Sequence, residues 1–432
     1  MTFSIRRIPY FSTLLLLIYM PFHVFLSQSV SEITGGLNEW KIAKDVVLAI
    51  LTLLSICLVW QQHRSTRLFN SLVGATVVYG LLLLGVWALH PHIYRTSAVL
   101  GVTYDLRLFC YTILGFSAVL LTKVNVRFVF KVVLLVCTTV SVLGIIQYLL
   151  PADFLTHLGY SVARGTRPNF FIDNNPEFPR IMSTIRDPNS LGAYLLVPIA
   201  LLVAMLLRAR NQRRRILFGA ALSVQLLALC LTFSRSAWLG GVIVVGLVVW
   251  WQYRHWFWKT MRGYWPVVTV MILLLGGVAY SQRHNPVLTH QTKLQVGRYD
   301  SNQLHAYLVQ QNVKAILHDP LGHGPGTAGL ASIHNPGGVN LTENYYLQVG
   351  YELGVVGLLL FIGMQLFLCI RLWSQRHGYL GLILLVSFWA YVLINMLLQE
   401  WDNEAVAAQW WLLAGLALGL PSLQTSHSKP IR

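Results

Sequence analysis

The sequence has few charged residues, and acidic ones are the scarcest. Only 11% of its 432 residues are Asp, Glu, Lys or Arg, and 15 acidic residues stand against 32 Lys and Arg. Soluble globular domains carry about a quarter charged residues, so this composition excludes an ordinary soluble protein. The hydrophobic share of 55% instead predicts an all-α polytopic membrane protein.

Cysteine is also rare. Each of the five cysteines falls inside a stretch that we expect to cross the membrane: Cys57, Cys110, Cys137, Cys230 and Cys369. This placement argues against a disulfide framework or a zinc site. The net charge of +17 could suggest nucleic acid, but the sequence has no basic soluble domain with interleaved aromatic residues to bind one. We attribute the charge to loops that face anionic membrane lipids.

Long apolar runs recur through the chain. Those that can cross about 30 Å of hydrocarbon lie at residues 10–30, 42–61, 71–90, 98–121, 128–150, 189–207, 216–233, 237–253, 264–281, 345–370, 379–398 and 405–421. We therefore predict about 12 transmembrane helices in a single integral membrane domain over residues 1–432. The first run is long and lacks a clear cleavage site, so we interpret it as an anchor.

Lys and Arg in the short connections set the orientation. They gather at 64–67, 123–131, 208–215, 254–262 and 371–376, which predicts that these connections and both termini are cytoplasmic. The connections 151–188 and 282–344 then lie on the external face, and both are too long to be simple turns. The second contains apolar residues at helical spacing from Leu304 to Leu317. We expect this segment to form an external helical cap.

Several arginines oppose this orientation bias and remain on the external side: Arg164, Arg167, Arg180, Arg186, Arg235, Arg283 and Arg298. Planar guanidinium groups match phosphate oxygens bidentately, so converging arginines at a membrane surface suit a lipid pyrophosphate. Asp187 and Asn189 fit a helix N-cap, but capping does not explain Arg186 at a positively charged helix start. Arg235 interrupts an apolar stretch. Its side chain could simply extend to the membrane surface, although a charged residue within an apolar stretch favours a functional role. Arg298 opens the external helix.

Glu343 precedes the long apolar run at 345–370. One interpretation is helix capping, with Thr342 as the N-cap and Glu343 in the first turn. The other is catalysis, because a carboxylate beside Tyr345 and Tyr346 would be partly desolvated, which raises its pKa toward that of a general base. Both can hold. Glu352, deeper in the run, is expected to make an internal hydrogen bond.

Other polar positions are weaker candidates. Gly322–Gly326 lacks the Lys-Ser/Thr of a nucleotide loop and predicts a turn that displays His323. Asp105 and Arg107 should each find a partner on a neighbouring helix, with a second role for Arg107 in substrate binding. The segment 400–404 is expected to contact the acceptor or form a solvated turn, with a metal site as the alternative. The secondary candidates are Asn189, His323, Asn344 and Arg107.

Four stretches occur in a fixed order: RDPNSLGAYL at 186–195, TFSRSAWLGG at 232–241, DPLGHGPG at 319–326 after Arg298, and ENYYLQVGYELGVVGLLLF at 343–361. Together they resemble the O-antigen ligase and O-antigen polymerase superfamily of bacterial envelope glycosyltransferases. The resemblance covers about residues 180–370, and the order and spacing of the motifs make the combination specific.

The resemblance implies a GT-C-like fold in the bacterial plasma (inner) membrane with an external, periplasmic active site. It implies a metal-independent glycosyltransferase without a cofactor, which moves a glycan from undecaprenyl pyrophosphate to an acceptor hydroxyl. Arg186, Arg235 and Arg298 would hold the pyrophosphate, and Glu343 would be the base. No metal is expected.

The sequence leaves the acceptor open. Ligases of this superfamily commonly have a His-Asn pair where Glu343 and Asn344 stand here, so the acceptor can be lipid A-core or another glycopolymer. A polymerase of O-antigen, capsule or exopolysaccharide repeat units is the alternative within the superfamily. A transporter of lipid-linked glycan is the alternative from another class, although no internal repeat supports it.

Overall fold

The structure is a computed structural model that describes residues 4–172, 175–254, 295–296, 299–336 and 338–426. Within these residues, 10 helices are long and apolar enough to cross a membrane. The predicted all-α polytopic membrane fold is thus confirmed. The predicted span at 264–281 lies outside the described residues, and the span at 405–421 corresponds to a helix whose apolar part, Glu404–Leu420, is shorter than the others.

The helices follow the predicted apolar runs closely. In chain order they are α1 (Ile8–Tyr19), α2 (His23–Thr34), α3 (Leu37–Gln61), α4 (Arg67–Leu89), α5 (Arg95–Leu121), α6 (Val126–Leu149), α7 (Pro188–Tyr194), α8 (Leu196–Arg208), α9 (Gln212–Leu231), the helix Arg235–Arg254, α12 (Ser301–His318), α13 (Tyr345–Ser374), α14 (Tyr379–Leu397) and α15 (Glu404–Ser426). A short 3₁₀ turn, Met20–Phe22, joins α1 to α2, and α7 runs directly into α8.

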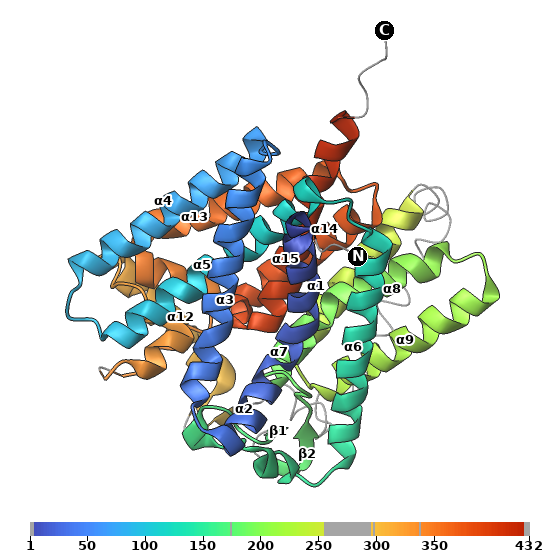
Figure 1. The fold of residues 1–432 in the computed structure, drawn as a ribbon. Helices are drawn as coiled ribbons and strands as arrows, with labels where there is room; N and C mark the ends of the chain where they lie inside the picture. Colours follow the sequence, from blue (N-terminus) through green and yellow to red (C-terminus); the bar gives the residue numbers. More distant parts are fainter. Residues whose placement is uncertain (1–3, 173–174, 255–294, 297–298, 337, 427–432) are drawn as a thin grey trace.

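Helix α15 lies in the middle of the bundle and packs most closely against α5 (Figure 1). Glycines make this approach possible, because a Cβ on Gly115 would overlap the carbonyl of Leu412 and one on Gly415 would overlap that of Thr112. Small residues let membrane helices approach until their backbones touch. The Trp410 and Trp411 side chains are fully buried around this contact. Helices α5 and α15 thus form a closely packed pair.

The connection 151–188 contains structure that the sequence did not predict. It forms two 3₁₀ turns, Phe154–Leu158 and Val162–Arg164, and an antiparallel hairpin of β1 (Phe170–Ile172) and β2 (Asn175–Arg180). Arg164 ties this region to α2, donating to Glu32 Oε2 at 2.6 Å and to Gln28 Oε1 at 3.2 Å. A second two-stranded pair, β3 (Gln295–Val296) with β4 (Tyr299–Asp300), precedes α12.

The predicted helix at 304–317 is α12, which packs against α13. Helix α13 contains one non-helical residue, Gly354, with φ +67°. The Gly322–Gly326 loop packs on this break, and Val355 N donates to Pro320 O at 3.0 Å. Glu352 Oε1 accepts from Gly326 N and from Ala328 N, each at 3.0 Å. The expected turn and the internal hydrogen bond of Glu352 are both confirmed.

We predict that Gly326→Ala destabilises the protein. Gly326 has φ +78°, and an added Cβ would overlap the carbonyl of Ser97 on α5. Left-handed strain and backbone overlap together should cost about 2 kcal/mol or more. Thermal unfolding in detergent measures the loss. Gly85→Ala, in α4 with open space around it, is the control and should unfold like the wild type. Equal unfolding midpoints for the two variants would show that the Gly326 contact is not tight.

Candidate functional site

Three of the predicted site residues, Arg186, Asn189 and Glu343, line one cavity of about 450 Å³. They come from segments that lie far apart in the chain: Arg186 precedes α7, Asn189 is in its first turn, and Glu343 precedes α13. The remaining walls come mainly from the 165–170 segment and the loop between α14 and α15. These further lining residues are Gly165, Thr166, Arg167, Phe170, Asp187, Ser190, Leu330, Leu341, Leu398, Gln399, Glu400 and Asn403.

Glu343 has an unusual backbone conformation. Its φ is +47°, a left-handed value that side chains other than glycine rarely adopt. The interpretation of Thr342 as the N-cap of α13 is wrong, because Asn344 is the cap and its Oδ1 accepts from Leu347 N at 3.0 Å. Asn344 Nδ2 also donates to Met396 O at 2.9 Å. The helix therefore begins at Tyr345, where the predicted apolar run begins, and Glu343 lies in the left-handed turn that precedes it.

The Glu343 carboxyl group is available for chemistry. Burial raises its pKa, and the nearby His305 on α12 lowers it. Within the described part of the chain, its oxygens accept no hydrogen bond and form no ion pair. A half-buried carboxylate without a protein partner is suited to accept a proton from a bound hydroxyl.

The segment around Arg186 leaves its guanidinium unoccupied. Asp187 caps α7, because its Oδ1 accepts from Asn189 N at 2.9 Å and from Ser190 N at 3.0 Å. The capping interpretation is thus correct for Asp187, whereas the side chain of Asn189 does not cap. Among the described residues, no hydrogen bond or ion pair holds the Arg186 side chain, which is half-buried. Arg186 can therefore bind an anion.

Arg180, at the end of β2, connects two of the predicted segments. Its Nη2 donates to Asn189 Oδ1 at 2.9 Å, and its Nε donates to Thr232 O at 2.8 Å. Burial lowers the pKa of Arg180, Asp187 raises it and Arg235 lowers it again, so these charged groups lie near one another. The sequence analysis counted Arg180 only among the external arginines. The one feature of the sequence that could have indicated a role for Arg180 is its positive charge on the external side, where Lys and Arg are otherwise scarce.

Arg235 and Arg298 are less closely tied to the cavity. Arg235 begins the helix Arg235–Arg254 and is exposed, directly after Phe233 and Ser234. Phe233 has φ +49°, a second strained position beside a predicted motif. The described residues that line the Glu343 cavity do not include Arg235, which lies on the side of Arg180. Arg298 lies outside the described residues.

His323 and Arg107 are not in this cavity. His323 lines a separate cavity, where its ring stacks on Tyr351 with centroids 4.0 Å apart. Arg107 is buried and donates to Asp402 O, while Asp105 Oδ1 accepts from Tyr345 OH at 3.3 Å. Asp105 and Arg107 therefore each find a partner on another element, as expected, and Arg107 has a structural contact.

The 400–404 segment is not a solvated turn, because Glu400 is 4% exposed and Asp402 is 1% exposed. Glu400 lines the same cavity as Glu343. Burial and the neighbouring Asp187 raise the pKa of Glu400 well above its ordinary value, while a hydrogen bond with Ser190 and the charge of Arg186 lower it. The cavity is thus lined by three carboxyl residues in different surroundings: Asp187, Glu343 and Glu400.

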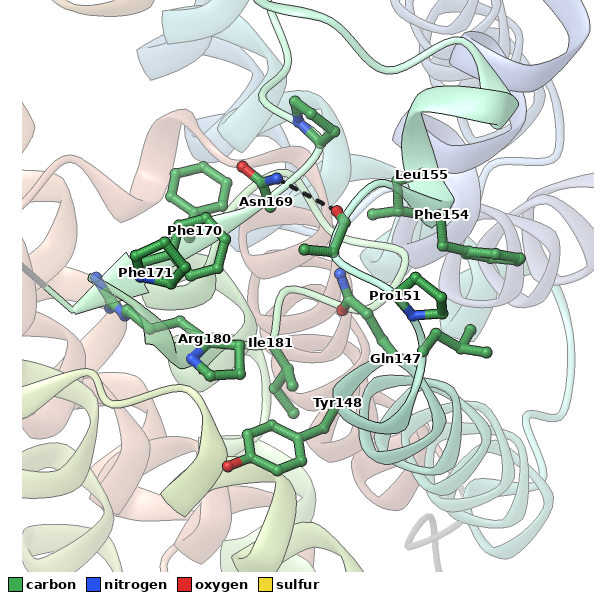
Figure 2. A pocket seen from close by; sticks show the side chains of 15 residues that line it. Gln147, Tyr148, Pro151, Phe154, Leu155, Asn169, Phe170, Phe171, Arg180 and Ile181 are labelled. Atoms are coloured by element: carbon green, nitrogen blue, oxygen red, sulfur yellow. Dashed lines mark hydrogen bonds between the residues drawn. The ribbon is translucent and has the colours of Figure 1, made fainter. Parts of the chain in front are cut away.

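Two further cavities adjoin this one. A larger cavity of about 680 Å³ shares Gly165, Thr166, Arg186 and Leu330 with it and extends toward α2 and α3. A smaller one of about 190 Å³ lies between the end of α6 and the β1–β2 hairpin, and Phe170 lines both it and the Glu343 cavity. Figure 2 shows its wall of aromatic and proline rings with Arg180 at one edge. Asn169 Nδ2 donates to Ala152 O across it at 3.2 Å.

Residues 220–362 match the family model described as O-antigen ligase. This match supports the resemblance of the chain to the O-antigen ligase superfamily. The matched region includes Arg235 and Glu343, whereas Arg186 lies before it. The match supports a membrane enzyme of the O-antigen ligase or polymerase type, a family that implies glycosyltransferase activity. No curated protein matches the sequence.

Proposed function

We propose that this chain transfers a glycan from undecaprenyl pyrophosphate to an acceptor hydroxyl at the periplasmic face of the bacterial plasma membrane. The observation that carries the proposal is the shared cavity of Glu343 and Arg186. Glu343 supplies a carboxylate and Arg186 supplies a guanidinium, and neither side chain forms a hydrogen bond or an ion pair with another described residue. These are the two groups that the reaction requires on either side of the reacting carbon.

In the proposed reaction, Glu343 takes the proton of the acceptor hydroxyl. The acceptor oxygen forms a bond to the anomeric carbon of the donor glycan. The bond from that carbon to the pyrophosphate oxygen breaks, and its electron pair leaves with undecaprenyl pyrophosphate. Arg186, with Arg235 and Arg298, neutralises the negative charge that gathers on the leaving group. The cations do the work that a metal ion would otherwise do, so the mechanism is metal-independent.

The acceptor is either lipid A-core, or another glycopolymer, or the growing glycan itself. The last case makes the enzyme a repeat-unit polymerase, which is the alternative to a ligase. Reconstituted enzyme with lipid-linked donor as the sole glycan tests it. A polymerase lengthens the donor glycan, whereas a ligase produces nothing until a separate acceptor is added.

We predict an acidic limb in the pH profile of transfer. The base acts only when deprotonated, so activity should fall as pH drops through the pKa of Glu343. Because burial raises this pKa, the fall should occur above the usual glutamate range. Initial rates across pH in the reconstituted system measure it. Residual activity of Glu343→Gln should lack this limb; if the variant keeps the limb unchanged, another group is the base.

A further inference from the structure

The larger cavity beside the Glu343 cavity carries several cationic side chains. Lys41, Lys44, Arg164 and Arg186 all line it. Two of them have carboxylate partners: Lys44 Nζ lies 2.7 Å from Asp45 Oδ2, and Arg164 Nη1 lies 2.6 Å from Glu32 Oε2. The ion pairs of the described residues include neither Lys41 nor Arg186.

Lys41 is held at the junction of the two cavities. Its Nζ donates one hydrogen bond to the backbone oxygen of Arg164 at 3.1 Å. An ammonium group has three N–H donors, so two others can contact a ligand. A Cβ built on Gly165 would lie 3.7 Å from the same Nζ, and Gly165 lines both cavities. Lys41 and Arg186 also interact electrostatically. Two like charges thus line one cavity, and neither forms an ion pair with another described residue.

Carboxyl groups near the pair offset part of its charge: Lys41 interacts electrostatically with Glu404, and Arg186 interacts with Asp402 and Glu400. Glu404 lies 3.8 Å from His23 Nε2 and interacts with the buried Lys44. Asp402 is buried beside Arg107, and Glu39 is exposed in the first turn of α3. Placing like charges together in a partly desolvated site is costly unless an anion binds between them. The arrangement therefore favours a ligand with a compact negative group.

We propose that the larger cavity is an oxyanion subsite in which Lys41 and Arg186 together bind a phosphoryl group of a substrate. The proposal rests on the proposed function, since it names a second substrate contact of the same site. The phosphoryl group belongs either to the donor pyrophosphate or to a phosphorylated acceptor saccharide. Lys41 supplies a point charge and Arg186 a planar pair of donors, a combination that suits tetrahedral oxyanions.

Binding of inorganic pyrophosphate to the detergent-solubilised full chain tests the subsite without turnover. Titration calorimetry should show binding to the wild type, and Lys41→Gln should weaken it about tenfold or more, because one charge-assisted contact is lost. Lys41→Arg, which keeps the charge, should bind within a few fold of wild type. Lys314→Gln removes one exposed lysine from α12 and should change nothing. Matched elution in size exclusion verifies that the variants are folded.

Steady-state transfer then identifies the source of the phosphoryl group. If Lys41→Gln raises KM for the lipid-linked donor alone, the group is the donor pyrophosphate. If it raises KM for a phosphorylated acceptor and spares its dephosphorylated form, the group belongs to the acceptor. Pyrophosphate binding that is absent in the wild type, or equal in wild type and Lys41→Gln, overturns the subsite. Full transfer by Glu343→Gln would instead refute the proposed base and leave the binding result standing.

Discussion

Glu343→Gln should lower the rate of glycan transfer by about 10² to 10⁴-fold, the range that a general base contributes. The substitution keeps the size and shape of the side chain and removes its basic oxygen. The carboxylate has no protein partner among the described residues, so its loss should leave the fold intact. Transfer by the purified variant in proteoliposomes, beside its yield and unfolding midpoint, measures both effects.

A matched control is Glu177→Gln, an exposed glutamate on β2 outside the three adjoining cavities. It should transfer like the wild type. Glu343→His should retain more activity than Glu343→Gln, because imidazole is a base and an amide is not. Near-normal transfer by a folded Glu343→Gln would remove Glu343 from the mechanism, and attention would pass to Glu400 in the same cavity.

Arg186→Lys should lower turnover by about 10² to 10³-fold although the charge is retained. Lysine offers a point charge in place of a planar pair of donors, so the bidentate hold on a phosphate is lost. Because the leaving group gathers charge as the glycosidic bond breaks, the contact strengthens in the transition state and kcat falls, beyond any change in donor KM. Arg235→Lys should also lose activity, since Arg235 interacts electrostatically with Arg180, which in turn donates to Asn189 of the cavity.

The control for the arginine series is Arg210→Lys, an exposed position in the short connection between α8 and α9. Arg208 serves less well, because its Nε donates to Gln252 Oε1 at 2.9 Å and its guanidinium lies over the Tyr379 ring. Arg210→Lys should transfer glycan at nearly the wild-type rate. Comparable activity for Arg186→Lys and Arg210→Lys would mean that Arg186 is an ordinary interfacial anchor.

The sequence predicted the membrane helices well, because lipid imposes a length and an apolarity that each span must meet alone. It gave the wrong N-cap for α13, since Thr342 and Asn344 are both good caps and the choice depends on the left-handed turn at Glu343. It missed the β1–β2 hairpin, whose strands are short and whose β2 strand contains two prolines. Hydropathy could not have prevented either error, because it gives no information on the structure of polar loops.

The sequence predicted which residues belong to the candidate site, but it did not predict how they are arranged in space. Arg186 and Glu343 stood out because each is a charge at the edge of an apolar run. That they share a cavity depends on how α7, α13 and the loop before α15 meet, which no local pattern encodes. The burial of Glu400 and Asp402 was missed for the same reason, because a short polar loop normally faces water. Arg180 and Lys41 gained significance only from their contacts.

The most direct test of the account follows the fate of the donor. The wild-type chain is reconstituted in proteoliposomes with a radiolabelled glycan on undecaprenyl pyrophosphate and an acceptor, without added metal, and both products are quantified. The account predicts release of undecaprenyl pyrophosphate in equal amount to the glycan gained by the acceptor or by a lengthened chain. Movement of the intact donor across the bilayer with no bond broken would contradict it and identify a transporter.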